Sequence, residues 1–139
     1  MQTILRILER AGGYRPTLYL KIENPPFMAL VIEAVPEPGP LNLPAISVAH
    51  YGKQNGDLMR DPEMCFELAK PGNEGLILDP YYWRNDYVAI EEWSRELVSG
   101  SYFALLGLHE RHKEFARMWD YNLGLQGFAE AFTDQSIRG

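Results

Sequence analysis

Cysteine is nearly absent from this sequence, which contains only Cys65 among its 139 residues. A single cysteine excludes an internal disulfide and any zinc site that needs several cysteines. Such sparse use of cysteine is typical of proteins from a reducing compartment. We therefore expect a cytoplasmic protein whose fold does not depend on disulfide bonds.

Long apolar runs are also missing. The longest, FMALVI at 27–32 and YFALLGL at 102–108, fall far short of the roughly 20 apolar residues that a membrane span needs. The N-terminal MQTILRILERAGG is interrupted by charged residues at helical spacing, unlike a signal peptide. The sequence therefore predicts a soluble protein with no membrane partner.

Positive charge is scarce and scattered. The chain has 13 lysine and arginine residues against 19 aspartate and glutamate residues, which gives a net charge of −6. A surface that binds phosphates needs clustered basic residues, and the sequence contains no such cluster. A net charge of −6 is also too small for a convincing DNA mimic. We do not expect nucleic acid to be the partner.

Apolar and aromatic residues are present in normal amounts. Hydrophobic residues make up 46% of the chain, and the 17 aromatic residues can build a substantial core or an interface. The length suits one domain with one core, so we assign residues 1–139 to a single domain.

The first 84 residues are predicted to form an N-terminal helix followed by a sheet. The apolar residues of 3–11 recur at helical spacing and share one face. Alternating or continuous apolar patterns predict strands at 17–23, 27–35, 45–51 and 63–68, and a short one at 76–78 after a loop at 70–75. The prolines after residue 23 and at 36–44 interrupt the ladder, since proline cannot donate to it.

The second half is predicted to be helical. Asn85 or Asp86 can cap a helix that runs to about residue 98, with Ile90, Trp93 and Leu97 on its buried face. Ser101 can cap a longer helix to about residue 120. Phe128 and Phe132 suggest one more helical segment. The predicted fold is therefore α+β: an antiparallel sheet of four to five strands (about 17–84), the N-terminal helix, and two to three C-terminal helices (about 86–133) packed on the sheet.

The stretch HYGKQNGDLMRDPEMCFE, residues 50–67, contains a hairpin signal with a register problem. Asn55-Gly56 favours a two-residue turn that pairs residue i with 111 − i. That ladder places the apolar residues of 64–68 on the opposite face from those of 46–48. Pairing i with 114 − i, so that Val48 meets Phe66, puts both sets on one face. We therefore predict a bulge or turn at residues 60–62, where Pro62 lacks an N–H donor.

The same stretch offers an alternative interpretation as a metal site. The side chains of His50, Asp57, Asp61 and Glu63 supply the imidazole and carboxylate ligands that divalent ions use. Their spacing matches no calcium-binding loop, and the predicted register turns His50 toward the core. The histidines of HERH, at 109 and 112, are three residues apart rather than the four of a zinc protease motif.

A second stretch, DPYYWRND at 79–86, is the stronger candidate for a binding surface. Tyr81, Tyr82, Trp83 and Arg84 are the residue types that are enriched at the centres of protein interfaces. Four large amphipathic side chains in one extended segment cannot all point inward. The alternative is that Trp83 and one tyrosine cover the end of the sheet while Arg84 pairs with an acid of the 61–63 turn.

The motifs QNGDLMRDPEMCFEL and WRNDYVAIEEW resemble a family of uncharacterised bacterial proteins found on plasmids, phages and integrative elements. The resemblance covers roughly residues 17–98. It implies a small accessory protein of mobile DNA and assigns no catalytic role to any residue. The matching positions of the hairpin are Asn55, Gly56, Asp57, Asp61, Pro62 and Glu63.

These observations favour a non-enzymatic protein-interaction or regulatory module that uses no cofactor. Its partner would be another protein or a second copy of the chain, bound through Tyr81–Arg84. The alternative is a metal-dependent hydrolase that uses His50, Asp57, Asp61 and Glu63.

Overall fold

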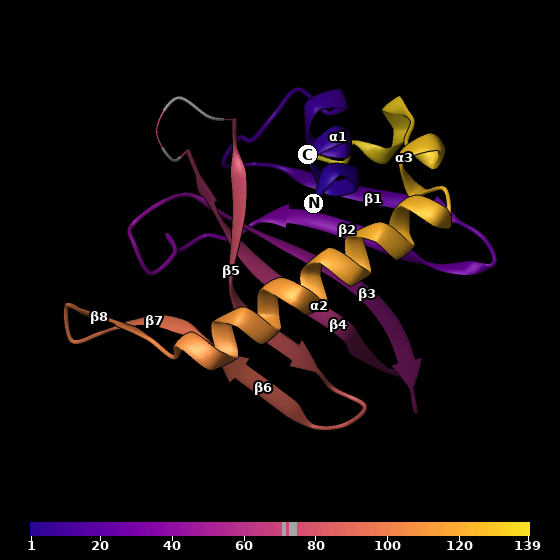
Figure 1. The fold of residues 1–139 in the computed structure, drawn as a ribbon. Helices are drawn as coiled ribbons and strands as arrows, with labels where there is room; N and C mark the ends of the chain where they lie inside the picture. The colour runs from indigo at the N-terminus through magenta and orange to yellow at the C-terminus, as the bar shows by residue number, and fades with distance from the viewer. Residues whose placement is uncertain (71, 73–74) are drawn as a thin grey trace.

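The computed structural model describes residues 1–70, 72 and 75–139, and its centre is a six-stranded antiparallel sheet (Figure 1). The strands lie side by side in chain order, so each pairs with its sequence neighbour through a short connection. They are β1 (Tyr19–Asn24), β2 (Phe27–Ala34), β3 (Ala45–Gln54), β4 (Asp57–Ala69), β5 (Ile77–Asn85) and β6 (Ile90–Trp93).

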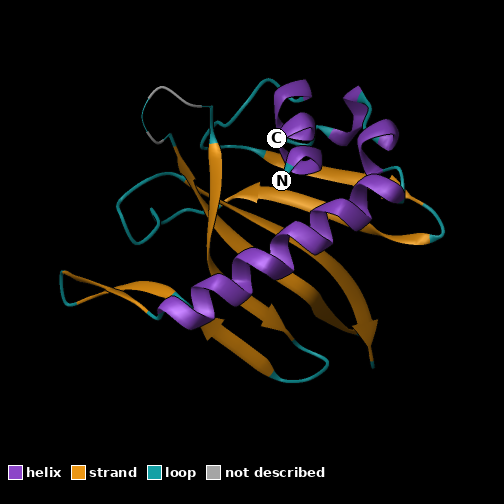
Figure 2. Cartoon of the chain, in the orientation of Figure 1, coloured by secondary structure: helices purple, strands orange, loops and turns teal. Residues whose placement is uncertain are grey.

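A separate two-stranded ribbon, β7 (Arg95–Val98) and β8 (Ser101–Ala104), extends from the edge of the molecule next to β6. The helices lie over one face of the large sheet, with the longest crossing it diagonally (Figure 2). They are α1 (Gln2–Arg10), α2 (Leu106–Leu125), α3 (Phe128–Ala131) and the 3-10 turn η1 (Asp134–Ser136). None of the helices in the described residues is long and apolar enough to cross a membrane.

The core lies between the sheet and the helices. Alternate strand residues such as Ile32, Ile46 and Phe66 are fully buried there against Ile7 of α1 and Leu123 of α2. This is the expected result of period-two alternation in strands and 3.6-residue periodicity in helices. The predicted α+β class, antiparallel sheet and N-terminal helix are confirmed.

The number of strands and the start of the helical part were predicted wrongly. The sheet has six strands rather than four to five, because residues 90–93 form a strand instead of part of a helix. Residues 86–89 reverse the chain in a turn, with Ala89 at φ +54°, so that Ile90 returns to pair with Asn85. Ser101 begins β8 rather than a helix, and α2 starts at Leu106. Residues 71, 73 and 74 of the predicted loop lie outside the described residues.

The irregularity predicted in β4 is confirmed, with a different register. Near the Asn55-Gly56 turn, residue i pairs with 111 − i, as in Tyr51 with Arg60. Beyond it, residue i pairs with 112 − i, so Val48 meets Met64 and not the predicted Phe66. Two residues of β4, 61 and 62, therefore face one residue of β3, which is a β-bulge. The extra residue returns the apolar side chains of 64–68 to the core face, as the parity of the pattern requires.

Candidate interaction surface

The predicted binding residues Tyr81, Tyr82, Trp83 and Arg84 lie on β5 and are largely covered. Tyr82 is buried, and the other three are half-buried. Tyr81 is the extra residue of a second bulge, since Cys65 pairs with Tyr82 while the next residue of β4 pairs with Pro80. The bulge brings the side chains of both tyrosines next to Cys65, whereas successive side chains of an uninterrupted strand point to opposite faces.

Neighbouring residues cover two of these side chains, Tyr82 and Trp83. Trp93 of β6 packs on Tyr82 with the ring centroids 5.0 Å apart, and the Tyr82 hydroxyl donates to the Glu91 carboxylate at 2.7 Å. Trp83 makes an edge-to-face contact with Phe115 of α2. Tyr82 and Trp83 of β5 are therefore packing partners for Trp93 of β6 and Phe115 of α2.

Arg84 forms an ion pair within its own segment. Its Nε lies 2.6 Å from Oδ1 of Asp86, so the partner is not an acid of the 61–63 turn as the alternative prediction had it. Asp86 also accepts the Arg60 N–H at 2.8 Å, and these contacts lower the pKa of its carboxyl group. Arg84 and Asp86 therefore fix the end of β5 and the turn that follows.

The exposed apolar residues of the molecule concentrate immediately after this segment. In the part of the chain that the structure describes, 19 large hydrophobic side chains are exposed, and ten of them fall within residues 87–106. We call these ten the 87–106 surface. They are Tyr87, Val88, Ile90, Trp93, Leu97, Val98, Tyr102, Phe103, Leu105 and Leu106.

The β7–β8 ribbon is the most prominent part of the 87–106 surface. Its two-residue turn has positive φ at Ser99 (+50°) and Gly100 (+80°), the geometry that matches the twist of a tight hairpin. The paired Leu97 and Tyr102 project on one face, and Val98 and Phe103 project on the other. All four are exposed, although a two-stranded hairpin without further packing is only marginally stable in water. An apolar ribbon that is open on both faces is suited to being covered by a partner.

The base of the ribbon is held by a buried ion pair. Arg95 of β7 and Glu67 of β4 are 2% and 1% exposed, and their charged atoms are 2.8 Å apart. The Arg95 guanidinium also lies 3.4 Å from the Asp79 carboxylate, which in turn contacts His109 of α2. Glu67 further accepts the backbone N–H of Leu41 at 2.8 Å. The ribbon is thus anchored at its base while its tip is free.

Two of the residues in the metal-site alternative lie on opposite faces of the sheet. His50 is on the helix side, where its Nδ1 is 3.0 Å from the Ala29 carbonyl oxygen and its ring packs against Trp119. Burial lowers the pKa of this imidazole. Glu63 is on the helix-free side, where it accepts the Ser47 hydroxyl at 2.6 Å.

The other two residues, Asp57 and Asp61, do not complete a metal-binding group of three with either of them. Asp57 is exposed at the turn of the β3–β4 hairpin, and Asp61 accepts the Asn85 side-chain amide at 2.9 Å. Across residues 1–70, 72 and 75–139, no three histidine, cysteine, aspartate or glutamate side chains are close enough to hold a metal ion. These four residues therefore do not assemble into one site.

A polar cluster on the helix-free face of the sheet was not predicted from the sequence. Arg60 pairs with Glu63 at 3.0 Å, and Ser47, Tyr51 and Glu33 lie around this pair. Burial, followed by the nearby Glu63 charge, raises the pKa of Glu33. The available signal was that polar residues at alternate positions of the predicted strands share one face.

Cys65 lies on the same face, opposite Ser47 rather than the predicted Ala49. Burial raises the pKa of its thiol far above the ordinary range, with the Glu63 charge adding to the effect. The thiol therefore stays protonated near neutral pH, which argues against a nucleophilic role.

Comparison with known proteins identifies a family. A family model described as "Domain of unknown function (DUF6908)" matches residues 2–129. The chain belongs to this family. The match extends well beyond the 17–98 segment that carried the sequence resemblance and includes α2 and the first residues of α3. No curated protein and no solved structure matched significantly. Neither comparison assigns a function to this DUF6908 chain.

Proposed function

We propose that this protein is a small non-enzymatic interaction module, an accessory factor of a mobile genetic element, which binds a protein partner through the 87–106 surface. The supporting observation is that ten of the 19 large hydrophobic side chains exposed among the described residues fall within 20 consecutive residues. At the ribbon, Trp93, Val98, Phe103 and Leu105 line one hollow and form a contiguous apolar patch, of the kind that marks interaction sites in folded proteins. The mobile-element role comes from the resemblance of the hairpin motifs.

The residues predicted from the sequence have a supporting role in this proposal. Tyr82 underlies Trp93, and Trp83 lies beside Ile90 in a small hollow between β6 and α2. Trp93 and Phe103 line another hollow, of about 340 Å³, on one face of the ribbon. Aromatic side chains on a rigid support, next to a hollow that a partner can fill, are typical of interface hot spots.

The test compares two aspartate variants at equally exposed positions. Phe103 is 57% exposed in the ribbon, and Leu58 is 60% exposed on β4, outside the 87–106 surface. A partner is first isolated with the wild type and identified by mass spectrometry. Titration calorimetry with the purified partner should then show affinity unchanged for Leu58→Asp and at least about tenfold weaker for Phe103→Asp, as expected for loss of a hot-spot residue.

Two outcomes would contradict the proposal. Equal affinity of the wild type, Leu58→Asp and Phe103→Asp for the partner would show that the interface does not include Phe103. A rise in melting temperature with Mg²⁺, Mn²⁺, Ca²⁺ or Zn²⁺, together with the absence of any protein partner, would instead favour the metal-dependent alternative.

A further inference from the structure

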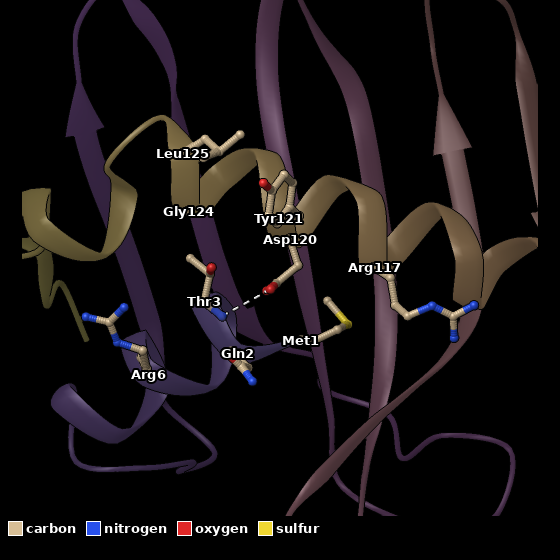
Figure 3. Close-up of a pocket in the computed structure, with 9 residues that line it drawn as sticks. All are labelled: Met1, Gln2, Thr3, Arg6, Arg117, Asp120, Tyr121, Gly124 and Leu125. Carbon is tan, nitrogen blue, oxygen red and sulfur yellow. Dashed lines mark hydrogen bonds between the residues drawn. The ribbon is translucent and has the colours of Figure 1, made fainter.

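We propose, on the basis of the function above, that the partner is a second copy of this chain: the β7–β8 ribbon of one copy docks into a hollow between α1 and α2 of the next. The hollow measures about 460 Å³ and lies beside the start of α1 and the last turns of α2 (Figure 3). Met1, Tyr121 and Leu125 give it apolar walls, and the last two are 67% and 70% exposed.

The hollow is bordered by positive charge. Arg6 of α1 and Arg117 of α2 line it, and Figure 3 shows them on opposite sides of the cluster. Neither arginine takes part in an ion pair among the described residues. The one carboxylate in the hollow, Asp120, is already engaged because it accepts the N–H groups of Thr3 and Ile4 at 3.1 and 2.9 Å. The hollow therefore suits an apolar segment with acidic flanks.

The ribbon has this composition. Residues 97–103, LVSGSYF, carry no charged side chain. The exposed charged residue in the ribbon is acidic, Glu96 on β7, whereas Arg95 is buried in its pair with Glu67. The apolar tip matches the apolar walls of the hollow, and Glu96 matches its arginines. Such complementarity of charge fixes orientation and suppresses wrong partners.

The ribbon cannot reach the hollow of its own chain. It precedes Leu106, the first residue of α2, whereas the hollow lies near Tyr121 of the same helix, about 22 Å farther along at 1.5 Å per residue. Figure 1 shows the ribbon extending away from the body of the molecule at the starting end of α2. The ribbon must therefore come from another copy, and in the head-to-tail arrangement proposed here the contact forms rings or open chains.

The experiment is light scattering coupled to size exclusion, from about 10 µM to about 1 mM, because an interface as small as one ribbon is at the weak end of the affinity range. We expect the wild type and Leu58→Asp to assemble as concentration rises and to dissociate with added salt. Phe103→Asp, which damages the ribbon, and the double variant Arg6→Glu/Arg117→Glu, which reverses the charge of the hollow, should each remain monomeric. Glu96→Lys, which keeps the apolar ribbon intact, should weaken assembly several-fold.

The decisive measurement is a mixture of the two monomeric variants. Each keeps the half of the contact that the other has lost, so an equimolar mixture should form dimers and nothing larger. Circular dichroism melts of the separate variants verify that both are folded. A mixture that stays monomeric while the wild type assembles would show a symmetric contact and overturn the head-to-tail mode.

A wild type that is monomeric at every concentration would also overturn this inference. It would leave the proposed function standing if an isolated partner still distinguishes Phe103→Asp from Leu58→Asp. Conversely, head-to-tail assembly that is equally strong in Phe103→Asp would remove the ribbon from both proposals.

Discussion

The β3–β4 and β7–β8 hairpins turn in the same way and are stabilised differently. Both use two residues at positive φ, Asn55-Gly56 in one and Ser99-Gly100 in the other. The first hairpin is the centre of a six-stranded sheet whose inner face is covered by helices, whereas the second pairs only with itself. The same turn geometry can therefore form either hairpin. Burial of the hairpin's side chains determines whether the hairpin stabilises the fold or stays exposed to a partner.

The largest expected difference is between two phenylalanines. Phe66 of β4 is fully buried, and Phe66→Ala should lower the free energy of unfolding by about 3–5 kcal/mol through lost burial and a cavity. Phe103→Ala in the exposed ribbon should change it by no more than about 0.5 kcal/mol. Urea denaturation at neutral pH measures both. Similar losses of unfolding free energy in the two variants would show that Phe103 contributes to the core as Phe66 does.

The connection between the two hairpins is the buried pair of Glu67 and Arg95. Arg95→Met should cost about 3–5 kcal/mol, because it leaves the Glu67 carboxylate buried without its partner. The control is Arg84→Met, whose ion pair with Asp86 is partly exposed and should contribute about 0–1 kcal/mol. The same denaturation experiment applies, and equal effects would show that Arg95 does not anchor the ribbon to the sheet.

The two turn glycines should respond differently to the same substitution. Gly56 and Gly100 have φ of +84° and +80°, so alanine is strained by about 1 kcal/mol at either position. Gly56→Ala should lower global stability by this amount. Gly100→Ala should leave global stability unchanged and speed hydrogen exchange in β7 and β8, because the ribbon opens locally. A global loss for Gly100→Ala would mean that the ribbon unfolds only with the whole protein.

The smallest effect concerns two histidines, one beneath each region. His50 packs under the central sheet, and His112 contacts Ser94 at the base of the ribbon. Burial lowers the pKa of both imidazoles below the ordinary 6.5. Unfolded histidine therefore takes up a proton first, and stability should decline as pH falls below 6.5.

The measurement is the urea midpoint at pH 7.5 and 5.5 for the wild type and for His50→Gln. The variant should lose less stability between the two pH values than the wild type does. An unchanged pH dependence would assign the effect to other groups.

The sequence predicted the central sheet well because burial there imposes a strict rule. Parity between residues 46–48 and 64–68 required an irregularity before Glu63, and the bulge at 61–62 supplies it. The exact offset could not be obtained in the same way, because offsets of 112 and 114 have the same parity. The choice between them depends on how many residues of β4 leave the regular pairing between the Asn55-Gly56 turn and Glu63.

Residues 86–98 were predicted as a helix because Ile90, Trp93 and Leu97 recur at helical spacing. These side chains are exposed in the structure, so their spacing does not reflect burial on one face of a helix. The exposed apolar side chains of residues 87–106 were not predicted for a related reason. The sequence showed a run of aromatic residues at 81–83, but only the tertiary structure reveals that Trp93 covers Tyr82.

The contact between Asp120 and the start of α1 has a consequence for the order of events during synthesis. The ribosome makes α1 before α2, yet a helix of nine residues is too short to persist alone in water. The carboxylate that accepts its first N–H groups arrives more than a hundred residues later. The α1 segment therefore cannot complete the hydrogen bonds at its start until Asp120 of α2 has been synthesised.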